Sequence, residues 1–244
     1  MTRAEEIEQR LLRLLSEGEF RPGERIGTER SLAEQLDVSR SLLRQGLERL
    51  ENQQRLRRSM GRTGGVFADD GKIQRHLNTV QGVPEMVRRQ GLTVRTTVIR
   101  AELASPSPSE QRALEMQGSS PVFRIVRIRH AGSASWSLDT SVLPARRFPR
   151  LLSQDLTVSL YRLLGREYEL TIDRAEETVE ATQATREQAE ELEIPMGAGL
   201  LEIHRVTYDE CHLPVEYAHD LFRADRTRIH TQKVGSSWKR ARNF

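Results

Sequence analysis

The sequence predicts an α+β protein with two domains, a mainly helical domain over residues 1–70 and a domain with an antiparallel sheet over residues 80–231. The first is indicated by residues 28–50, where apolar side chains recur at helical spacing on both sides of a two-residue turn. The second is indicated by residues 122–143 and 200–222, two pairs of strand-like segments that are each joined by a short turn. Short helical segments accompany these hairpins, as is typical of the α+β class.

The composition of the 244-residue chain narrows the class of protein. Its length suits one large domain or two ordinary ones. It has no apolar run of about 18 residues, so we expect no membrane span. Residues 1–20 are charged and periodic, which predicts a helix and not a signal peptide. The single cysteine, Cys211, excludes an internal disulfide and a cysteine-rich metal cluster. We therefore expect a cytoplasmic protein.

Residues 28–50 predict two short helices joined by a tight turn. Thr28 and Ser39 are suitable N-caps for the first and the second helix. Gly46 lies on the apolar face of the second helix, where glycine costs about 1 kcal/mol against alanine, so we expect a close helix approach there. The first turn of the second helix carries serines and arginines, which suit phosphates and base edges. A helix-turn-helix presents its recognition helix in this way.

The residues that follow favour a DNA-binding motif over a generic helical hairpin with solvated arginines. Residues 55–58 and 65–68 predict two short strands, and the glycine-rich loop between them contains Arg62. A basic, glycine-rich hairpin directly after a recognition helix is a wing. Its glycines let the backbone approach phosphate or enter the minor groove, and Arg62 supplies positive charge.

The distribution of charge supports this interpretation. Residues 1–70 hold 13 arginines and 13 acidic residues, so their net charge is zero. Within them, residues 38–68 hold seven arginines against Glu48 and Glu51, a net charge of +5, which leaves −5 for the rest. A protein with one basic surface and acidic residues elsewhere is oriented on DNA by electrostatic attraction to the phosphates.

The run FRPGERIGTERSLAEQLDVSRSLLRQGLERL, followed by GRTGGVF, resembles the winged helix of GntR-type bacterial transcription regulators over roughly residues 5–68. The resemblance implies operator contacts from the arginine of the ER pair, the serine–arginine turn, the arginine four positions later and the wing glycine. Carried over to this sequence, these are Arg30, Ser39, Arg40, Arg44 and Gly61, with Ser41 as a further candidate. Two positions depart from the family pattern: Gly27-Thr28 replaces the usual Pro-Ser, and Leu42 replaces a threonine or alanine.

Beyond the first domain, turn residues predict a linker at residues 71–79, and residues 232–244 predict a basic, disordered tail. Helices are predicted at residues 84–90, from about Ser107, at 157–164 and at 185–192. Strands are predicted at residues 93–103, 122–130, 136–143, 169–182, 200–208 and 213–222.

The two hairpins resemble each other in where their charged residues fall. Arg127 and Arg205 precede the two turns, and Asp139 and Glu216 follow on the return strands. This weak internal repeat suggests that two carboxylates converge from related positions.

The segments RIRHAGSASWSLDTSVLP, SLYRLL and LPVEYAHDLFRADR resemble the UTRA effector-binding domain of the HutC subfamily, over about residues 80–229. The resemblance implies a chorismate lyase-like fold. In members that sense amino-sugar phosphates, it implies that paired arginines and the SLY motif bind phosphate and that acidic residues of the return strands bind hydroxyls. The matching positions are Arg127, Arg129, Ser159, Tyr161, Asp139 and Glu216. Three departures adjoin the implied effector site: Asp139 for a glutamate, Phe222 for a tyrosine, and Val83-Pro84 for Phe-Thr.

Arg127 and Arg129 alternate along one strand, so both point to a face that they share with large apolar side chains. Two like charges there need an anionic partner, either an effector or an internal salt bridge to Asp139 or Glu216. A two-residue turn at 132–133 would put Asp139 on the face opposite to Arg127. For both side chains to lie on one face, the hairpin needs a bulge or a loop with an odd number of residues.

Ser159 and Tyr161 begin a helix whose free N–H groups favour phosphate, although either residue would equally serve as an ordinary cap. The six histidines show no metal-ligand spacing. His204 and His219 are positioned to face each other across the second hairpin, which makes a zinc site conceivable, but a paired or exposed histidine is the simpler interpretation. The sequence shows no nucleophile–base pair and no glycine-rich phosphate loop, so we expect no catalytic residue, metal or cofactor.

Together these features predict a homodimeric transcription regulator that binds a palindromic, double-stranded DNA operator. We expect a repressor that a small anionic effector, a sugar phosphate or a small carboxylate, releases from DNA. The second domain would supply the dimer interface and the effector pocket. The alternative is an enzyme of chorismate lyase-like fold that acts on a small anionic metabolite, but likeness of fold alone is weak evidence for catalysis.

Overall fold

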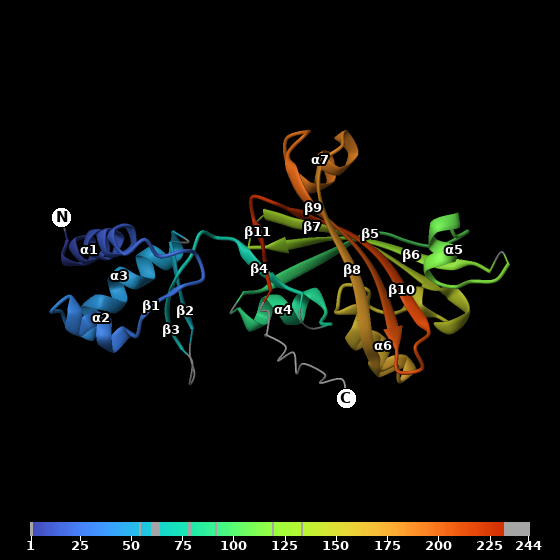
Figure 1. The fold of residues 1–244 in the computed structure, drawn as a ribbon, viewed down its shortest axis with the longest axis horizontal. Coiled ribbons are helices and arrows are strands. Elements are labelled where there is room, and N and C mark those ends of the chain that lie inside the picture. The colour runs from blue at the N-terminus through green and yellow to red at the C-terminus, as the bar shows by residue number, and fades with distance from the viewer. Residues whose placement is uncertain are drawn as a thin grey trace, which may run out of the picture. The chain divides into compact units, whose positions relative to one another are not determined.

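The computed structural model describes residues 2–231 apart from residues 54, 60–63, 78–79, 91, 119 and 133. The chain forms two compact units, and it passes from the first to the second between Lys72 and Ile73 (Figure 1). Among the described residues, no helix combines the length and the apolar character that crossing a membrane requires.

The first unit contains three helices and a small three-stranded sheet. The helices are α1 (Arg3–Glu17), α2 (Glu29–Gln35) and α3 (Arg40–Asn52). The strands are β1 (Arg25–Gly27), β2 (Leu56–Ser59) and β3 (Gly65–Ala68), in the order β1-β3-β2. Thr28 and Ser39 cap α2 and α3 as predicted, because each hydroxyl accepts a hydrogen bond from a backbone N–H three residues later.

The core of this unit forms where the apolar faces of the helices meet. Leu43, Leu47 and Leu50 of α3 are fully buried there, and Ile7 of α1 packs with them. A Cβ atom on Gly46 would lie 2.7 Å from Cγ2 of Ile7. The predicted close approach at Gly46 is therefore present, and the helix that approaches is α1.

The second unit is built on a six-stranded antiparallel sheet in the order β5-β6-β7-β10-β9-β8. Its strands are β5 (Val94–Ala104), β6 (Val122–Ala131), β7 (Ala134–Pro144), β8 (Ile172–Gln183), β9 (Gly199–Asp209) and β10 (Pro214–Arg223). The two predicted hairpins, β6–β7 and β9–β10, join through the β7–β10 pair, which brings their return strands together. The predicted antiparallel α+β architecture is confirmed.

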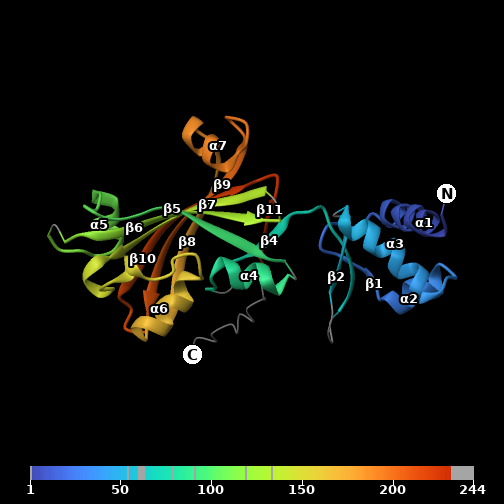
Figure 2. The same ribbon diagram turned by 180° about the vertical axis from the view of Figure 1, so that it is seen from behind.

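Helices cover both faces of this sheet (Figures 1 and 2). One face carries α4 (Val83–Arg89), α6 (Leu160–Tyr168) and the 3-10 turns η1 (Ala145–Arg147) and η2 (Leu151–Ser153). The other carries α5 (Pro108–Ala113) and α7 (Arg186–Leu192). Beneath α6 and beneath α4 lie two separate apolar clusters, so the sheet between them is free to carry polar side chains.

The predicted linker at 71–79 needs a correction, since it contains the strand β4 (Ile73–His76). This strand pairs in parallel with β11 (Thr227–His230), and Ile73 and Arg75 are buried. Four residues are too few to show an alternation in the sequence, and the partner strand is remote in the chain. Residues 78–79 and the predicted tail at 232–244 lie outside the described residues.

Candidate functional site

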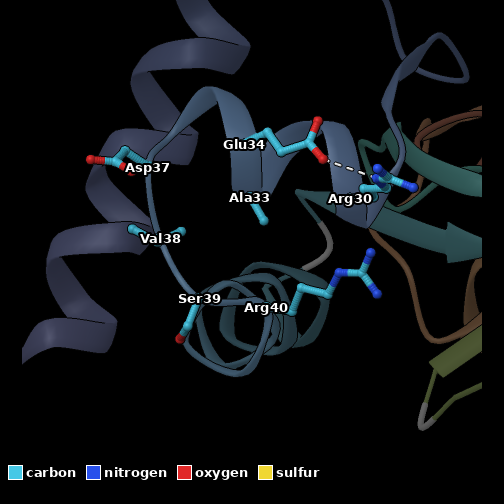
Figure 3. Close-up of a pocket in the computed structure, with 7 residues that line it drawn as sticks. All are labelled: Arg30, Ala33, Glu34, Asp37, Val38, Ser39 and Arg40. Atoms are coloured by element: carbon cyan, nitrogen blue, oxygen red, sulfur yellow. Dashed lines mark hydrogen bonds and ion pairs between the residues drawn. The ribbon is translucent and has the colours of Figure 1, made fainter.

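The first unit presents the predicted DNA-contacting residues at the start of α3 and on neighbouring α2. Arg30, Ser39, Arg40, Ser41 and Arg44 are all exposed. An open hollow between α2 and the start of α3 is lined by Arg30, Ser39 and Arg40, among others (Figure 3). The guanidinium groups of Arg30 and Arg40 lie on the same side of this hollow. The surface therefore gathers cations around a helix N-terminus, where anions are favoured.

Two of these arginines already have weak internal partners. Arg30 Nε lies 2.9 Å from a carboxylate oxygen of Glu34, and Arg44 Nε lies 2.7 Å from one of Glu29. Both arginine side chains are mostly solvent-exposed, and exposed ion pairs contribute little stability, so a phosphate or a base edge can replace these partners. The Arg40 side chain makes no hydrogen bond or ion pair with the described residues.

The predicted wing is present as the β2–β3 hairpin, in which Arg58 lies opposite Val66 and Ser59 lies opposite Gly65. Its tip, which contains the predicted contact residues Gly61 and Arg62, lies outside the described residues. Arg58 at its base is committed to the fold, because its Nη2 lies 2.6 Å from a carboxylate oxygen of Glu51.

In the second unit, the register of the sheet brings the predicted effector residues to one face. Arg127 on β6 lies directly opposite Asp139 on β7, which lies opposite Asp220 on β10. The β6–β7 hairpin reaches this register through a bulge between Arg129 and His130. The sequence required such a bulge for Arg127 and Asp139 to share a face, and the structure confirms it.

Polar side chains from all six strands form a band across this face, between the apolar clusters under α4 and α6. The polar band consists of Thr96, Arg127, Arg129, Ser137, Asp139, Ser141, Glu177, Arg205, Thr207, Glu216 and Asp220. Buried charges need partners, so the hydrogen bonds of each member decide which are structural and which remain for a ligand.

Arg129 is held by the protein itself. Its Nε donates to a carboxylate oxygen of Asp139, and its Nη1 donates to the Thr96 hydroxyl at 3.0 Å. The Ser137 hydroxyl donates to the second oxygen of Asp139 at 2.6 Å. Burial raises the pKa of Asp139, but the positive charges of Arg129 and Arg127 outweigh it, so the pKa is lowered and the carboxylate stays ionised. For Arg129 the internal salt bridge, one of the two predicted partners, is present.

Arg205 holds a second set of carboxylates. Its guanidinium lies 2.8 Å from Asp220 and 3.4 Å from Glu216. The Tyr161 hydroxyl donates to Glu216 at 2.7 Å, so this predicted phosphate ligand is engaged within the protein. Burial raises the pKa of Glu216, but Arg205 and hydrogen bonds, including that from Tyr161, lower it below its usual value. Asp220 differs, because burial raises its pKa despite Arg205.

Arg127 is the cation of the polar band with the most donor atoms left over, since Arg205 leaves only its Nε without a partner among the described residues. The Nη2 of Arg127 donates to the Ser141 hydroxyl at 3.1 Å, whereas its Nε and Nη1 have no hydrogen-bond partner among the described residues. The side chain is only 3% exposed. Burial, followed by the nearby charge of Arg129, lowers the pKa of Arg127 to about 10, so the group is still a cation at neutral pH. A buried guanidinium with two free donors is suited to an anion.

Arg127 is among the residues that line a small pocket beneath α4 and α6, with a volume of about 20 Å³, enough for about one water molecule. The lining residues are Gln81, Gly82, Val83, Pro84, Arg127, Arg129, Asp139, Leu160, Tyr161, Arg205, Glu216 and Asp220. Ser159, the N-cap of α6, adjoins the pocket at Gly82, where a Cβ atom would lie 2.5 Å from the serine hydroxyl oxygen. That hydroxyl is buried and has no hydrogen-bond partner among the described residues, so it too remains available.

One predicted effector residue needs a correction. Phe222 is fully buried in the cluster beneath α4, where its ring packs edge-on against Trp136 at 5.0 Å between centroids. It lies on the same face as Asp220 but two residues further along β10, past the polar band. Its side chain is used by the core and does not line the pocket.

Sequence reasoning missed Asp220 and Ser141, and it did not assign Arg205 to the site. Ser141 lies two residues from Asp139 on β7, and Asp220 lies four residues from Glu216 on β10. Even spacing puts side chains on the same face of a strand, so the alternation could have identified both residues. Arg205 occupies the position in the second hairpin that Arg127 occupies in the first, which the internal repeat already indicated.

Each of the two units matches a known protein family. The family described as "UTRA domain" matches residues 89–228, and the family described as "Bacterial regulatory proteins, gntR family" matches residues 3–66.

Two similar proteins are each 29% identical to this chain over 226 residues. One is the "Probable fructoselysine utilization operon transcriptional repressor" of Escherichia coli K12, with 91% of each chain covered. The other is the HTH-type transcriptional repressor NagR of Bacillus subtilis, with 92% of each chain covered. The crystal structure of PhnF from Mycobacterium smegmatis is 25% identical, with a TM-score of 0.67 over 94% of this chain and 100% of that one.

Proposed function

Since this chain belongs to the GntR family of bacterial transcription regulators, in the HutC type that carries a UTRA domain, we propose that it is a repressor that a small anionic effector releases from its operator. Its relatives are transcription regulators, and the chain is accordingly not an enzyme. The repressor role is supported by the similarity to NagR and to the fructoselysine operon protein, both of which are described as repressors. We further propose a homodimer on a palindromic site, because one winged helix contacts little DNA and two copies are the usual solution.

In this proposal the first turn of α3 enters the major groove and the wing contacts the backbone. The exposed guanidinium groups of Arg40 and Arg44 are suited to guanine edges, and Ser39, Ser41 and Arg30 to phosphates. Replacing Arg40 or Arg44 by alanine should each cost roughly 1–3 kcal/mol of operator affinity.

A mobility shift with the operator measures this loss, and Arg13→Ala is the matched control. Arg13 is exposed on α1 and takes no part in the proposed surface, so its replacement should leave the affinity unchanged. Unchanged affinity in both α3 variants would show that another surface binds DNA.

The effector assignment rests on one observation, the buried Arg127 guanidinium with two free donors at the wall of a pocket. The unpartnered hydroxyl of Ser159 adds a further hydrogen-bonding group beside the same pocket. Asp139 and Glu216 offer acceptors to the hydroxyls of a polyhydroxylated anion. The proposed effector is therefore a small phosphate or carboxylate compound, with its anionic group on Arg127.

A thermal-shift screen tests the assignment directly. Glucose 6-phosphate, inorganic phosphate and citrate serve as anionic probes, and glucose serves as the neutral control. A probe at 100 times its dissociation constant stabilises the protein by roughly 2.7 kcal/mol, which is readily detected. We expect stabilisation by an anionic probe that also weakens operator binding. If glucose stabilises as strongly as the charged probes, or if no anion has an effect, the effector is not an anion of this class.

A further inference from the structure

The face of the sheet opposite the polar band carries a second cluster of titratable side chains. His204 on β9 and His219 on β10 are directly opposed across the hairpin. Their rings are stacked, with centroids 4.6 Å apart and planes within 4° of parallel. Glu202, two residues before His204, reaches both rings. The sequence suggested that the two histidines would face each other, and the register confirms it.

The distances among these three side chains are close to those of a metal-ligand set. A carboxylate oxygen of Glu202 lies 2.6 Å from His219 Nε2 and 3.5 Å from His204 Nε2. One ligand atom from each residue lies within 4.8 Å of the other two. In a tetrahedral zinc site with bonds of about 2.0 Å, neighbouring ligand atoms are about 3.3 Å apart. Because the two rings are parallel, both must turn out of the stack for their Nε2 lone pairs to meet at one ion.

Two surrounding groups favour a cation at this position. Glu180 on β8 lies directly opposite Glu202, and like charges in opposed cross-strand positions repel each other. A cation between the strands would relieve that repulsion. The Tyr217 hydroxyl lies 3.3 Å from His204 Nδ1 and can accept a hydrogen bond from the Nδ1–H group, which leaves Nε2 unprotonated for a metal. An oriented partner on the second imidazole nitrogen is the usual support of a ligating histidine.

We propose that Glu202, His204 and His219 form a binding site for a divalent transition-metal ion. Zinc is the best match to two imidazoles and one carboxylate. Within the part of the chain that the structure describes, no fourth histidine, cysteine or carboxylate joins these three, so water completes the coordination. All three side chains are half-buried, which keeps the site open to ions from solvent. The site lies on the two strands that also carry Arg205, Glu216 and Asp220 on their other face.

The simpler interpretation is a hydrogen bond between His219 and Glu202 beside a stacked histidine. Metal titration separates the two. Full-length protein without a histidine tag is stripped with EDTA, dialysed and titrated with ZnCl₂ by calorimetry. Titration with Co²⁺ in parallel gives the visible absorption of a tetrahedral site. We expect one zinc ion per chain.

The variants are His204→Ala, His219→Ala and Glu202→Gln, with His212→Asn as the control. His212 lies in the turn of the same hairpin, is exposed and has a positive φ that asparagine tolerates. Loss of a residue that only supports a metal ligand weakens metal binding by up to about 100-fold. Each histidine variant removes a ligand itself, so it should weaken zinc binding by more than that. His212→Asn should leave zinc binding unchanged. Circular dichroism and urea unfolding in EDTA show that the second unit of each variant is folded.

The outcomes are distinct. One equivalent of zinc that is lost in the three cluster variants and kept in the control supports the site. No zinc binding by the wild-type protein at micromolar concentrations, or zinc binding that depends on His212 instead of His219, overturns it. If the alanine variants do not fold, Glu202→Gln decides, because it keeps the shape of the side chain and removes the charged ligand.

Discussion

Replacing Arg127 by methionine should remove the effector response without harming the fold. Arg127 donates one hydrogen bond, to Ser141, and two of its donors are buried without a partner among the described residues. Burial lowers its pKa to about 10, which corresponds to roughly 3 kcal/mol against the charged form at 1.36 kcal/mol per pKa unit. Methionine keeps the apolar stem and removes the buried charge. The free energy of unfolding should therefore stay unchanged or rise by about 1–3 kcal/mol.

Arg129→Met is the matched comparison, because Arg129 lies two residues away on the same strand and is equally buried. Its guanidinium is the ion-pair partner of Asp139, which is only 2% exposed. Removing it leaves a buried carboxylate unpaired, so the free energy of unfolding should fall by about 3–5 kcal/mol.

Urea unfolding without effector measures both values. Thermal shift with the most stabilising anionic probe then measures the response of Arg127→Met, and an operator mobility shift verifies that the variant still binds DNA. We expect an intact fold, normal operator affinity and no ligand response. Equal destabilisation by the two substitutions would mean that Arg127 is a structural ion-pair residue. A normal ligand response in Arg127→Met would remove it from the effector site.

Three further predictions concern the wing, a helix contact and pH. Arg62→Ala should weaken binding to specific and to random DNA alike, and should reduce the slope of log affinity against log salt concentration by about one. A loss of affinity confined to one base position would show instead that Arg62 contacts a base. Gly46→Ala should cost roughly 1–3 kcal/mol in urea unfolding, because its Cβ would collide with α1. Gly165→Ala, on the exposed side of α6 where an added Cβ meets no atom nearer than 3.5 Å, should instead gain up to about 1 kcal/mol, and equal effects would refute the contact. The pKa of Glu216 is lower in the folded protein than the unfolded value of 4.5. The stability that its ionised form contributes is therefore complete above pH 4.5 and is lost as the pH falls through the lower pKa of the folded protein. Unfolding midpoints should thus decline more steeply below pH 4.5 in wild type than in Glu216→Gln, and parallel curves would contradict this.

The parts of the fold that follow from local patterns were predictable. The caps at Thr28 and Ser39, the apolar face around Gly46 and the two long hairpins depend on residues close together in the chain. The strand β4 was not predictable in the same way, since its only strand partner lies near the end of the described chain. Pairings of this kind have no local signature.

The sequence identified some residues of the polar band, among them Arg127, Asp139 and Glu216, but not how they pair with one another. Alternation placed Arg127 and Arg129 on one face, yet nothing in the sequence distinguishes the arginine that Asp139 binds from the one left free. That difference depends on the bulge between Arg129 and His130 and on the order in which β7 and β10 meet. Phe222 failed as a site residue because a family position does not specify whether an aromatic ring faces a pocket or the core.

The pairing of β4 with β11 has a consequence for how the chain folds as it is made. The first unit needs only residues up to 72, whereas β4, which follows at once, must wait for residues 227–230. At typical translation rates the two strands leave the ribosome roughly 8–30 s apart. A nascent or prematurely terminated chain thus carries a finished winged helix on a strand that has no partner. The strand that leaves the winged helix is therefore secured only when the last described strand, β11, has been made.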